Sequence, residues 1–176
     1  MKSATVSVIG RPSAGKSTMV NTICEMKVSI TSSIPQTTRN KIRGIYTDQR
    51  GQLVFVDTPG YHISEKTINR KMQDVTVSAL GESDIILYVL DGKRAPKKEE
   101  EVLADLIAKA GVPVVCAINK KDILTKAEEE DMEFFLKNRF PSAPILLTSS
   151  KDDDGIDELL IELFKLAPEG ELMYSE

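Results

Sequence analysis

The stretch TVSVIGRPSAGKSTMVNTICEM, residues 5–26, decides the fold. It opens with Thr5–Ile9, a mostly apolar run rich in β-branched residues that predicts a buried strand. A loop bounded by glycines follows, and apolar residues then recur at helical spacing from Ser17 to Met26. A strand, a tight glycine loop and a helix in direct succession predict the first unit of an α/β domain.

Strands and helices continue to alternate along the chain. Lys41–Thr47 and Gln52–Asp57 predict two strands joined at the turn Asp48–Gly51. Asp84–Leu90 and Val112–Ile118 are short and almost wholly apolar, as expected of strands covered on both faces. A last strand is predicted over 145–148, and helical periodicity covers residues 68–80 (with Gly81 as a C-cap), 97–110 (followed by Gly111), 126–138 and 156–166.

This order predicts a doubly wound α/β fold. We expect a mostly parallel six-stranded sheet with helices on both faces, in which the close strand pair supplies one antiparallel strand. The length of 176 residues fits one domain. Residues 1–168 are predicted to form that domain, and residues 169–176, which show no clear periodicity, a C-terminal tail.

Composition and charge exclude several classes of protein. Hydrophobic residues make up 41% of the chain, enough for a core. Cys24 and Cys116 do not form a spaced cluster, so we expect a reducing compartment and neither a disulfide framework nor a zinc site. No apolar run approaches the roughly 20 residues of a bilayer span, and we expect no signal peptide. The net charge of −4 argues against a general nucleic-acid binder.

The glycine loop carries the first chemical signal, the pattern GxxxxGK[ST] of a P-loop NTPase. Backbone N–H groups in such a loop can surround phosphate oxygens, and the following helix points its positive end at the same place. Lys16 is expected to reach the β- and γ-phosphates, and Ser17 to place its hydroxyl on Mg²⁺. The predicted phosphate-binding residues are Gly10, Arg11, Pro12, Ser13, Ala14, Gly15, Lys16, Ser17 and Thr18.

A second signal, Asp57-Thr58-Pro59-Gly60, stands at the end of an apolar strand. The Asp57 carboxylate can hold Mg²⁺ through a water molecule. The Gly60 N–H can bind the γ-phosphate and so respond to its presence. The motif is common when taken alone, and its position after the P-loop makes it informative.

A third signal, Asn119-Lys120-Lys121-Asp122, follows another apolar strand. The two oxygens of Asp122 can accept the two donors on one edge of guanine, N1–H and the exocyclic amino group, which adenine does not match. The stem of Lys120 can cover the base, and Asn119 can tie this loop to the P-loop. Ser149-Ser150-Lys151 after the last strand can add a backbone N–H for the guanine O6.

Residues 27–40 lie between the first helix and the next strand and contain Gln36-Thr37-Thr38-Arg39. A hydroxyl here can complete the Mg²⁺ shell when the γ-phosphate is bound, which would make the segment a switch; simple solvation of the loop is the alternative. Two clusters of basic residues could each contact RNA or a protein partner, or could simply form a solvated face. They are Arg39, Lys41 and Arg43, and Lys93, Arg94, Lys97 and Lys98.

The motifs together resemble the Era GTPases, which are ribosome-assembly factors. The resemblance covers essentially the whole chain and is carried by GRPSAGKST, SITSSIPQTTRNKI, DTPGYH, NKKD and LAPEG. It implies that Thr38 is the Mg²⁺-binding switch threonine and that 36–40 is the effector segment. A KH-type domain that binds 16S rRNA normally follows. The sequence stops at Glu176, so we expect this stretch to carry only the GTPase half.

The resemblance also implies partners and a location: GTP and GDP, the 30S subunit through the KH domain, a monomeric state, and the cytoplasm with peripheral association with the inner membrane. Two positions depart from the family. Ser13 stands where the family usually has Asn, a residue that helps related GTPases bind K⁺, so K⁺ stimulation is in doubt. Tyr61 follows Gly60, where the family has an apolar residue and Ras-like proteins have Gln. His62 is interpreted as a solvated loop residue.

The predicted activity is hydrolysis of GTP to GDP and phosphate. Catalysis is assigned to Lys16, Thr38 and Gly60, and Mg²⁺ binding to Ser17, Thr38 and Asp57, because phosphoryl transfer needs positioning and charge neutralisation more than a general base. Without a water-orienting Gln, turnover is expected to be slow, about 10⁻⁴ to 10⁻³ s⁻¹. The alternative is a GTP-gated scaffold that does not hydrolyse the nucleotide.

Overall fold

The computed structural model describes residues 1–25, 42–57 and 70–174. Six strands form one sheet in the order β2-β3-β1-β4-β5-β6, with β2 antiparallel to β3 and every other pair parallel. The predicted doubly wound sheet with one antiparallel strand is confirmed. The strands are β1 (Lys2–Ile9), β2 (Ile42–Asp48), β3 (Gly51–Asp57), β4 (Ile85–Asp91), β5 (Val114–Asn119) and β6 (Ile145–Leu147).

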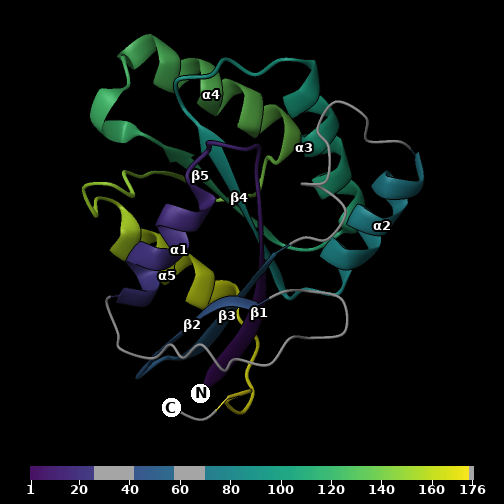
Figure 1. Cartoon of the computed structure of the whole chain (residues 1–176), viewed down its shortest axis with the longest axis vertical. Coiled ribbons are helices and arrows are strands. Elements are labelled where there is room, and N and C mark those ends of the chain that lie inside the picture. Colours follow the sequence, from purple (N-terminus) through teal and green to yellow (C-terminus); the bar gives the residue numbers. More distant parts are fainter. Residues whose placement is uncertain (26–41, 58–69, 175–176) are drawn as a thin grey trace.

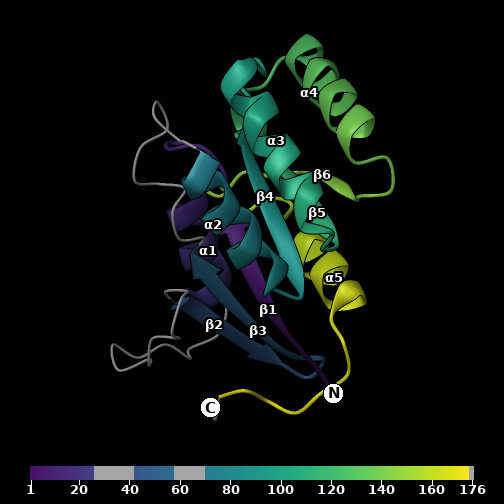
Figure 2. The same ribbon diagram turned by 90° about the vertical axis from the view of Figure 1, so that its right-hand side faces the viewer.

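The helices cover both faces of the sheet (Figures 1 and 2). One face packs against α1 and α5, the other against α2, α3 and α4, and each interface is an apolar cluster that includes residues of the central strands. A short 3₁₀ turn, η1, follows β5. The bounds are α1 (Lys16–Glu25), α2 (Arg70–Gly81), α3 (Lys98–Ala110), η1 (Lys121–Ile123), α4 (Lys126–Arg139) and α5 (Ile156–Leu166).

Two helix ends follow clear local signals, and one expected signal, at Gly81, acts differently. Gly111 ends α3 in the left-handed conformation, with φ 69°, and Thr125 forms a capping box with Glu128 at the start of α4. Gly81 was expected to cap α2 from outside, but it is the last helical residue and is not among the glycines with positive φ. After Gly81 the hydrogen bonds change to the 3₁₀ pattern, which joins residues three apart: Glu82 N donates to Ala79 O, and Ser83 N donates to Leu80 O.

The strand bounds differ from the sequence prediction mainly in β1. It begins at Lys2 rather than Thr5, because Lys2, Ser3 and Ala4 pair in parallel with Gly51, Gln52 and Leu53 of β3. Pairing with a neighbouring strand adds polar residues that the apolar pattern excluded. The predicted ends at Met26, Lys41 and Ile68 lie outside the described residues.

The last described residues, 168–174, lie against the amino-terminal ends of β1 and β3. Ser3 N donates to Pro168 O at 3.0 Å, and Gly170 N to Met1 O at 3.0 Å. The fully buried amide of Gln52 accepts from the backbone N–H groups of Met173 and Tyr174 at 2.9 and 3.0 Å. This stretch is therefore attached to the sheet, although the domain boundary at residue 168 stays a prediction.

No helix in the described part of the chain has both the length and the apolar character that a membrane span requires. Both cysteines are buried: Cys24 packs in the cluster under α1, and burial raises the pKa of the Cys116 thiol to about 12. Both are core residues.

Candidate nucleotide-binding site

The loop between β1 and α1 lies at the carboxyl edge of the sheet and needs its two glycines for steric reasons. A Cβ at Gly10 would lie 2.2 Å from Val89 O, on the neighbouring strand β4. Gly15 has φ +98°, and a Cβ there would lie 2.3 Å from the Asn119 amide nitrogen. The backbone can follow this path only without side chains at these positions. Ser13 also has positive φ, 70°, although it is not a glycine.

Lys16 begins α1 and its side chain turns back over the loop. Its Nζ donates to Gly10 O at 2.6 Å, so the ammonium group lies against the backbone of the predicted phosphate-binding loop. Arg11, at the other side of the loop, pairs with Glu99 at 2.7 Å. This arrangement brings a cation and the amino end of a helix to one small region, which is the chemistry that a polyphosphate requires.

The loop after β5 is joined to the P-loop by a buried amide. Asn119, at the end of β5, donates from Nδ2 to Ala14 O at 2.9 Å. Its Oδ1 accepts from Thr148 Oγ1 at 3.2 Å and from Ser150 N at 3.1 Å. The contact between Asn119 and the P-loop that the sequence suggested is present. The amide also reaches the Ser149–Lys151 loop, so three predicted segments meet at one side chain.

Lys120 and Asp122 are held in place by neighbouring side chains. Lys120 has φ 72°, and its Nζ donates to Asp91 Oδ2 at 2.8 Å. Asp122 accepts from Ser149 Oγ at 3.0 Å through Oδ1. Because Ser149 occupies only one of the two carboxylate oxygens in these contacts, Asp122 keeps acceptor capacity toward a ligand.

These residues surround a pocket of about 480 Å³. Its lining residues are Ser13, Gly15, Thr18, Asn119, Lys120, Asp122, Ile123, Ser149, Ser150 and Lys151. Hollows of similar volume, about 510 Å³, exist elsewhere on the molecule, so volume alone does not identify the site. Its lining makes it the candidate, because among the pockets formed by the described residues it is the one that contains both P-loop residues and residues of the loop after β5.

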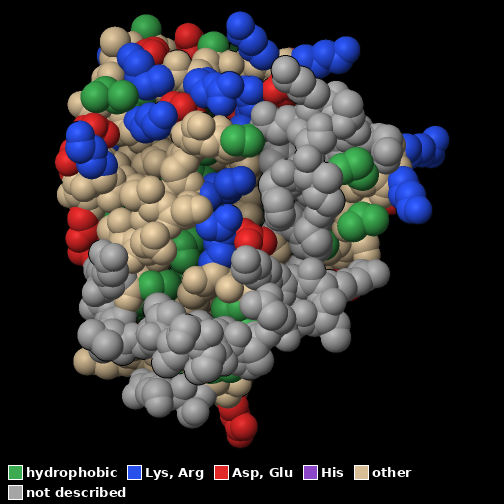
Figure 3. Space-filling view, in the orientation of Figure 1, with side chains coloured by type: hydrophobic (Ala, Val, Ile, Leu, Met, Phe, Trp, Pro, Cys, Tyr) green, Lys and Arg blue, Asp and Glu red, His purple; other side chains and the backbone are tan. Residues whose placement is uncertain are grey.

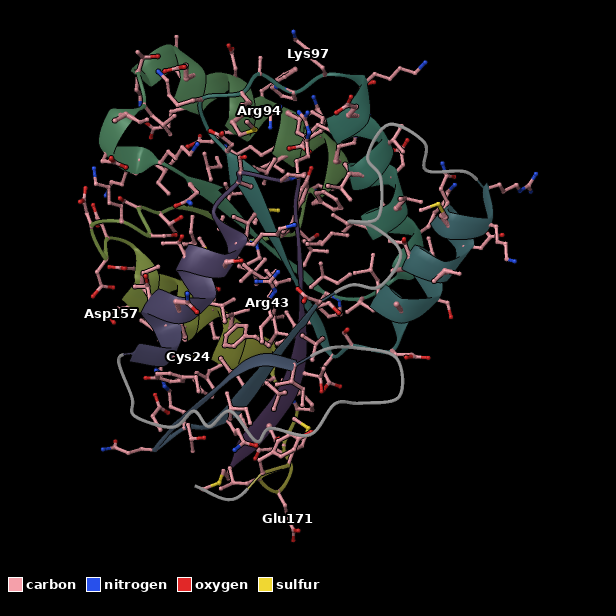
Figure 4. The ribbon with its side chains drawn as sticks, viewed as in Figure 1. Cys24, Arg43, Arg94, Lys97, Asp157 and Glu171 are labelled. Atoms are coloured by element: carbon pink, nitrogen blue, oxygen red, sulfur yellow. The ribbon has the colours of Figure 1, made fainter. Side chains whose placement is uncertain are left out.

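One of the other hollows contains the second basic cluster. Lys93, Arg94, Lys97 and Lys98 line it together with Arg11. Figure 4 labels Arg94 and Lys97 near the top of the molecule, where Figure 3 shows blue side chains. Arg94 donates to Pro12 O at 3.3 Å, and Lys93 pairs with Glu128 at 2.7 Å.

The second predicted motif, Asp57-Thr58-Pro59-Gly60, is described only at Asp57. Asp57 ends β3, and its carboxylate is hydrogen-bonded to Arg43 Nε. Nη1 of the same guanidinium donates to Ser17 Oγ at 2.6 Å. A solvated strand face, one of the two alternatives for Arg43, is therefore wrong: the side chain points to the P-loop (Figure 4). Thr38, Thr58, Pro59, Gly60, Tyr61 and His62, and likewise Arg39 and Lys41, lie outside the described residues.

Sequence reasoning missed residues that act through others. Asp91 positions Lys120, and Thr148 bonds to Asn119. Ile123 lines the pocket with 54% of its surface exposed. Asp91 could have been found, because it ends a strand at the same sheet edge as Asp57 and Asn119, where ligands bind in open α/β sheets.

The fold and this pocket define the class of P-loop α/β domains, with a pocket whose lining suits a nucleoside phosphate. The model of a family described as 50S ribosome-binding GTPase matches residues 5–120. The chain belongs to that family. The Era resemblance is confirmed over the whole chain: it is 44% identical over 176 residues to GTPase Era of Borrelia turicatae and 46% identical over 178 residues to GTPase Era of Treponema denticola. It spans 61% and 60% of those relatives' lengths.

Solved Era structures match as well. A structure of Aquifex aeolicus Era bound to GDP and AlF₄⁻ matches with a TM-score of 0.75 and 29% identity, over 99% of this chain and 60% of that one. A structure of Era in complex with MgGDPNP and nucleotides 1506–1542 of 16S ribosomal RNA matches with a TM-score of 0.77 and the same identity and coverage. These ligands belong to those proteins.

Proposed function

We propose that this chain binds GTP and GDP with Mg²⁺ and hydrolyses GTP to GDP and phosphate. One observation carries the proposal: a single pocket joins the P-loop to Asp122, and the buried Asn119 amide fixes the two halves against each other. A phosphate-binding loop alone would suit any nucleotide. A carboxylate at the far end of the same pocket selects a base with two adjacent donors, which is guanine.

The residues near the P-loop fit a magnesium ion. The Ser17 hydroxyl and the Asp57 carboxylate come from different elements, yet one guanidinium bonds to both, so a single cation can be shared between them. Both are hard oxygen donors, which Mg²⁺ prefers. Ser17, Asp57 and, by the family resemblance, Thr38 would hold the ion, which would neutralise charge on the phosphates.

Within the nucleotide site, the roles follow from chemistry. The Lys16 ammonium and the P-loop amides would stabilise the charge on the transferred phosphoryl group. Thr38 and Gly60 would respond to the γ-phosphate, which would make the nucleotide state a switch. The same pocket would also serve a GTP-gated scaffold. Catalysis is favoured because the similar Era structure with GDP and AlF₄⁻ contains a mimic of phosphoryl transfer.

For the protein as a whole, we propose a role in assembly of the small ribosomal subunit, with 16S rRNA as a partner. The support is similarity to Era, including the structure with an RNA fragment. A cytoplasmic, ribosome-associated location with peripheral contact with the inner membrane follows from the same similarity. The proposal also includes a monomeric state. K⁺ stimulation of hydrolysis is not part of it, because Ser13 stands where the family usually has Asn.

The proposal is tested by measuring phosphate release from GTP and from ATP, in potassium and then in sodium buffer. We expect slow release from GTP only, on the order of 10⁻⁴ to 10⁻³ s⁻¹. Lys16→Ala should abolish it, because the ammonium group that neutralises the phosphates is gone. Lys137→Ala removes an exposed lysine of α4 that does not line the pocket, so it is the control and should keep the rate.

Equal turnover of ATP would exclude the proposed base recognition. Tight GTP binding without any phosphate release by the parent would favour the scaffold instead.

A further inference from the structure

Arg43 lies beside the P-loop although it belongs to none of the nucleotide-binding motifs. It lies in β2 and its guanidinium reaches two other elements: Nη1 donates to Ser17 Oγ at 2.6 Å, at the start of α1, and Nε donates to Asp57 Oδ1, at the end of β3. The Arg43 side chain is 28% exposed and that of Asp57 17% exposed. The guanidinium is therefore partly withdrawn from water and bridges a hydroxyl and a carboxylate.

The strand geometry accounts for this direction. The register between β2 and β3 shifts between Ile42 and Gly44: Ile42 pairs with Val56, and Gly44 with Phe55. Arg43 is the residue at this irregularity, and a bulge of this kind redirects the side chain it carries. Ile42, the residue before Arg43, packs with Ile45, Val54 and Val56 in a small apolar cluster of β2 and β3. The Arg43 side chain instead reaches Ser17 of α1.

We propose that Arg43 is a built-in competitor of Mg²⁺ at this site. The proposal rests on the proposed function, in which Ser17 and Asp57 hold the ion. The guanidinium uses the Ser17 oxygen, which would contact the metal, and the Asp57 oxygen, which would hold its water. The Ser17 oxygen cannot bond to both cations at once, and the repulsion between the guanidinium and Mg²⁺ opposes their sharing the Asp57 carboxylate. Arg43 is thus a positioning residue: it keeps the two oxygens near one another and releases them when Mg²⁺ arrives with the nucleotide.

The competition has a measurable consequence. Hydrogen bonds between a guanidinium and a carboxylate are charge-assisted and stronger than neutral ones, so Mg²⁺ must displace a real interaction. By linkage, whatever stabilises the metal-free arrangement raises the Mg²⁺ concentration needed to tighten nucleotide binding. Removing the guanidinium should lower that concentration and leave metal-independent contacts to the nucleotide unchanged.

The test uses fluorescently labelled GDP. Its dissociation constant is measured from EDTA to millimolar MgCl₂ for the parent chain, Arg43→Met and Arg43→Lys, and the midpoint of the Mg²⁺ effect is compared. Methionine keeps an unbranched stem of similar reach but carries no charge. Arg50→Met is the matched control, because Arg50 forms its own ion pair, with Asp48 at 2.6 Å, on the same hairpin and away from Ser17 and Asp57.

We expect the Mg²⁺ midpoint of Arg43→Met to fall by about fivefold to tenfold, with the GDP affinity in EDTA changed by no more than about twofold. Arg43→Lys should lie between the parent and Arg43→Met, because an ammonium group cannot bridge the two oxygens as a planar guanidinium does. Arg50→Met should behave as the parent. If Arg43→Met does not fold, the Lys variant decides.

An unchanged midpoint in both Arg43 variants would overturn the inference. So would an equal loss of GDP affinity at every Mg²⁺ concentration, since Arg43 would then contact the phosphates directly. A parent chain that binds no labelled GDP at any Mg²⁺ concentration would instead refute the proposed function, and this inference with it.

Discussion

At the scale of single residues, Asp122 is the position at which base selection can be tested. Asp122→Asn replaces one acceptor oxygen with an amide donor, which would face the N1–H and amino group of guanine. We expect GDP affinity to fall by roughly 10²-fold or more, and xanthosine diphosphate, whose base has an oxygen in place of that amino group, to become the preferred ligand. Competition titrations against labelled nucleotide measure both.

Asp152→Asn is the control for the loss of one acidic charge near the pocket. Asp152 is exposed, and only its backbone N–H is bonded to Ser149, at 3.2 Å. The Asp152→Asn variant should leave the affinities for GDP and for xanthosine diphosphate unchanged. Undiminished GDP binding by the Asp122 variant would refute the proposed base recognition.

The position of a residue in the site could be predicted where a sequence motif contains it. It could not be predicted where the residue lies far away in the sequence and reaches the site only through the fold. All the lining residues of the nucleotide pocket except Ile123 follow from three short patterns, because each pattern fixes the backbone and the side chains together. Arg43 is 26 positions from Ser17 in the sequence, and its contact depends on a register shift in a strand pair. No local pattern carries that information, so its alternation with Arg39 and Lys41 was misleading.

At the scale of elements, α4 offers a prediction about pH. Hydrogen bonding from Lys93, helped by the Thr125 N–H, lowers the pKa of Glu128 from 4.5 to about 2. A group whose pKa is depressed in the folded state contributes stability above its unfolded value, and loses it as the pH falls through the folded value. The Glu128 contribution should therefore be complete above about pH 4.5 and should disappear as the pH approaches 2.

Glu128→Gln tests this, because glutamine can still accept from Thr125 N and keep the capping box, but cannot pair with Lys93. We expect a melting temperature lower by about 2 °C or less at pH 7, since the pair is partly exposed, and a smaller difference at lower pH. In a Lys93→Met background, where this ion pair is already absent, Glu128→Gln should show a smaller pH dependence. A difference between parent and Glu128→Gln that stays constant from pH 7 to 3 would contradict the assignment.

The order and type of these elements could be predicted because apolar periodicity reports burial directly. The helix 156–166 was placed to the residue, since its apolar face is strong and Gly155 precedes it. The start of β1 was not, because pairing with β3 extends β1 to Lys2. The end of α2 was not, because Gly81 belongs to the helix and does not take the left-handed conformation of a glycine cap.

At the scale of the whole molecule, residues 169–174 bring the C-terminal end of the described chain back against the N-terminus and the sheet. Gln52 is fully buried in β3, and its amide makes three bonds to this stretch: from Met173 N, from Tyr174 N, and to Tyr174 O at 2.8 Å. Tyr174 also packs on the cluster formed by Ile42, Ile45, Val54 and Val56. The tail is thus held largely by hydrogen bonds to its backbone groups, and a sequence without periodicity gives no sign of such bonds.

The tail should therefore contribute to global stability and not to nucleotide binding. A chain ending at Pro168 leaves the Gln52 amide without three partners, and water replaces them only incompletely at a site built for backbone groups. We expect the free energy of unfolding to fall by about 1–3 kcal/mol. Urea unfolding measures this, and a chain ending at Tyr174 is the control, since it keeps all three bonds.

Gln52→Leu completes the argument as a double-mutant cycle. If the tail acts through Gln52, truncation at Pro168 should cost clearly less in the Gln52→Leu background than in the parent, because the shared bonds are already lost. Additive losses would mean that the tail stabilises the sheet through Tyr174 and the β1 contacts alone. Equal urea midpoints for the chains ending at Pro168 and Tyr174 would show that the tail contributes no stability. In each case the affinity for labelled GDP should be unchanged, because the tail lies at the amino-terminal ends of β1 and β3, opposite the edge that carries the pocket.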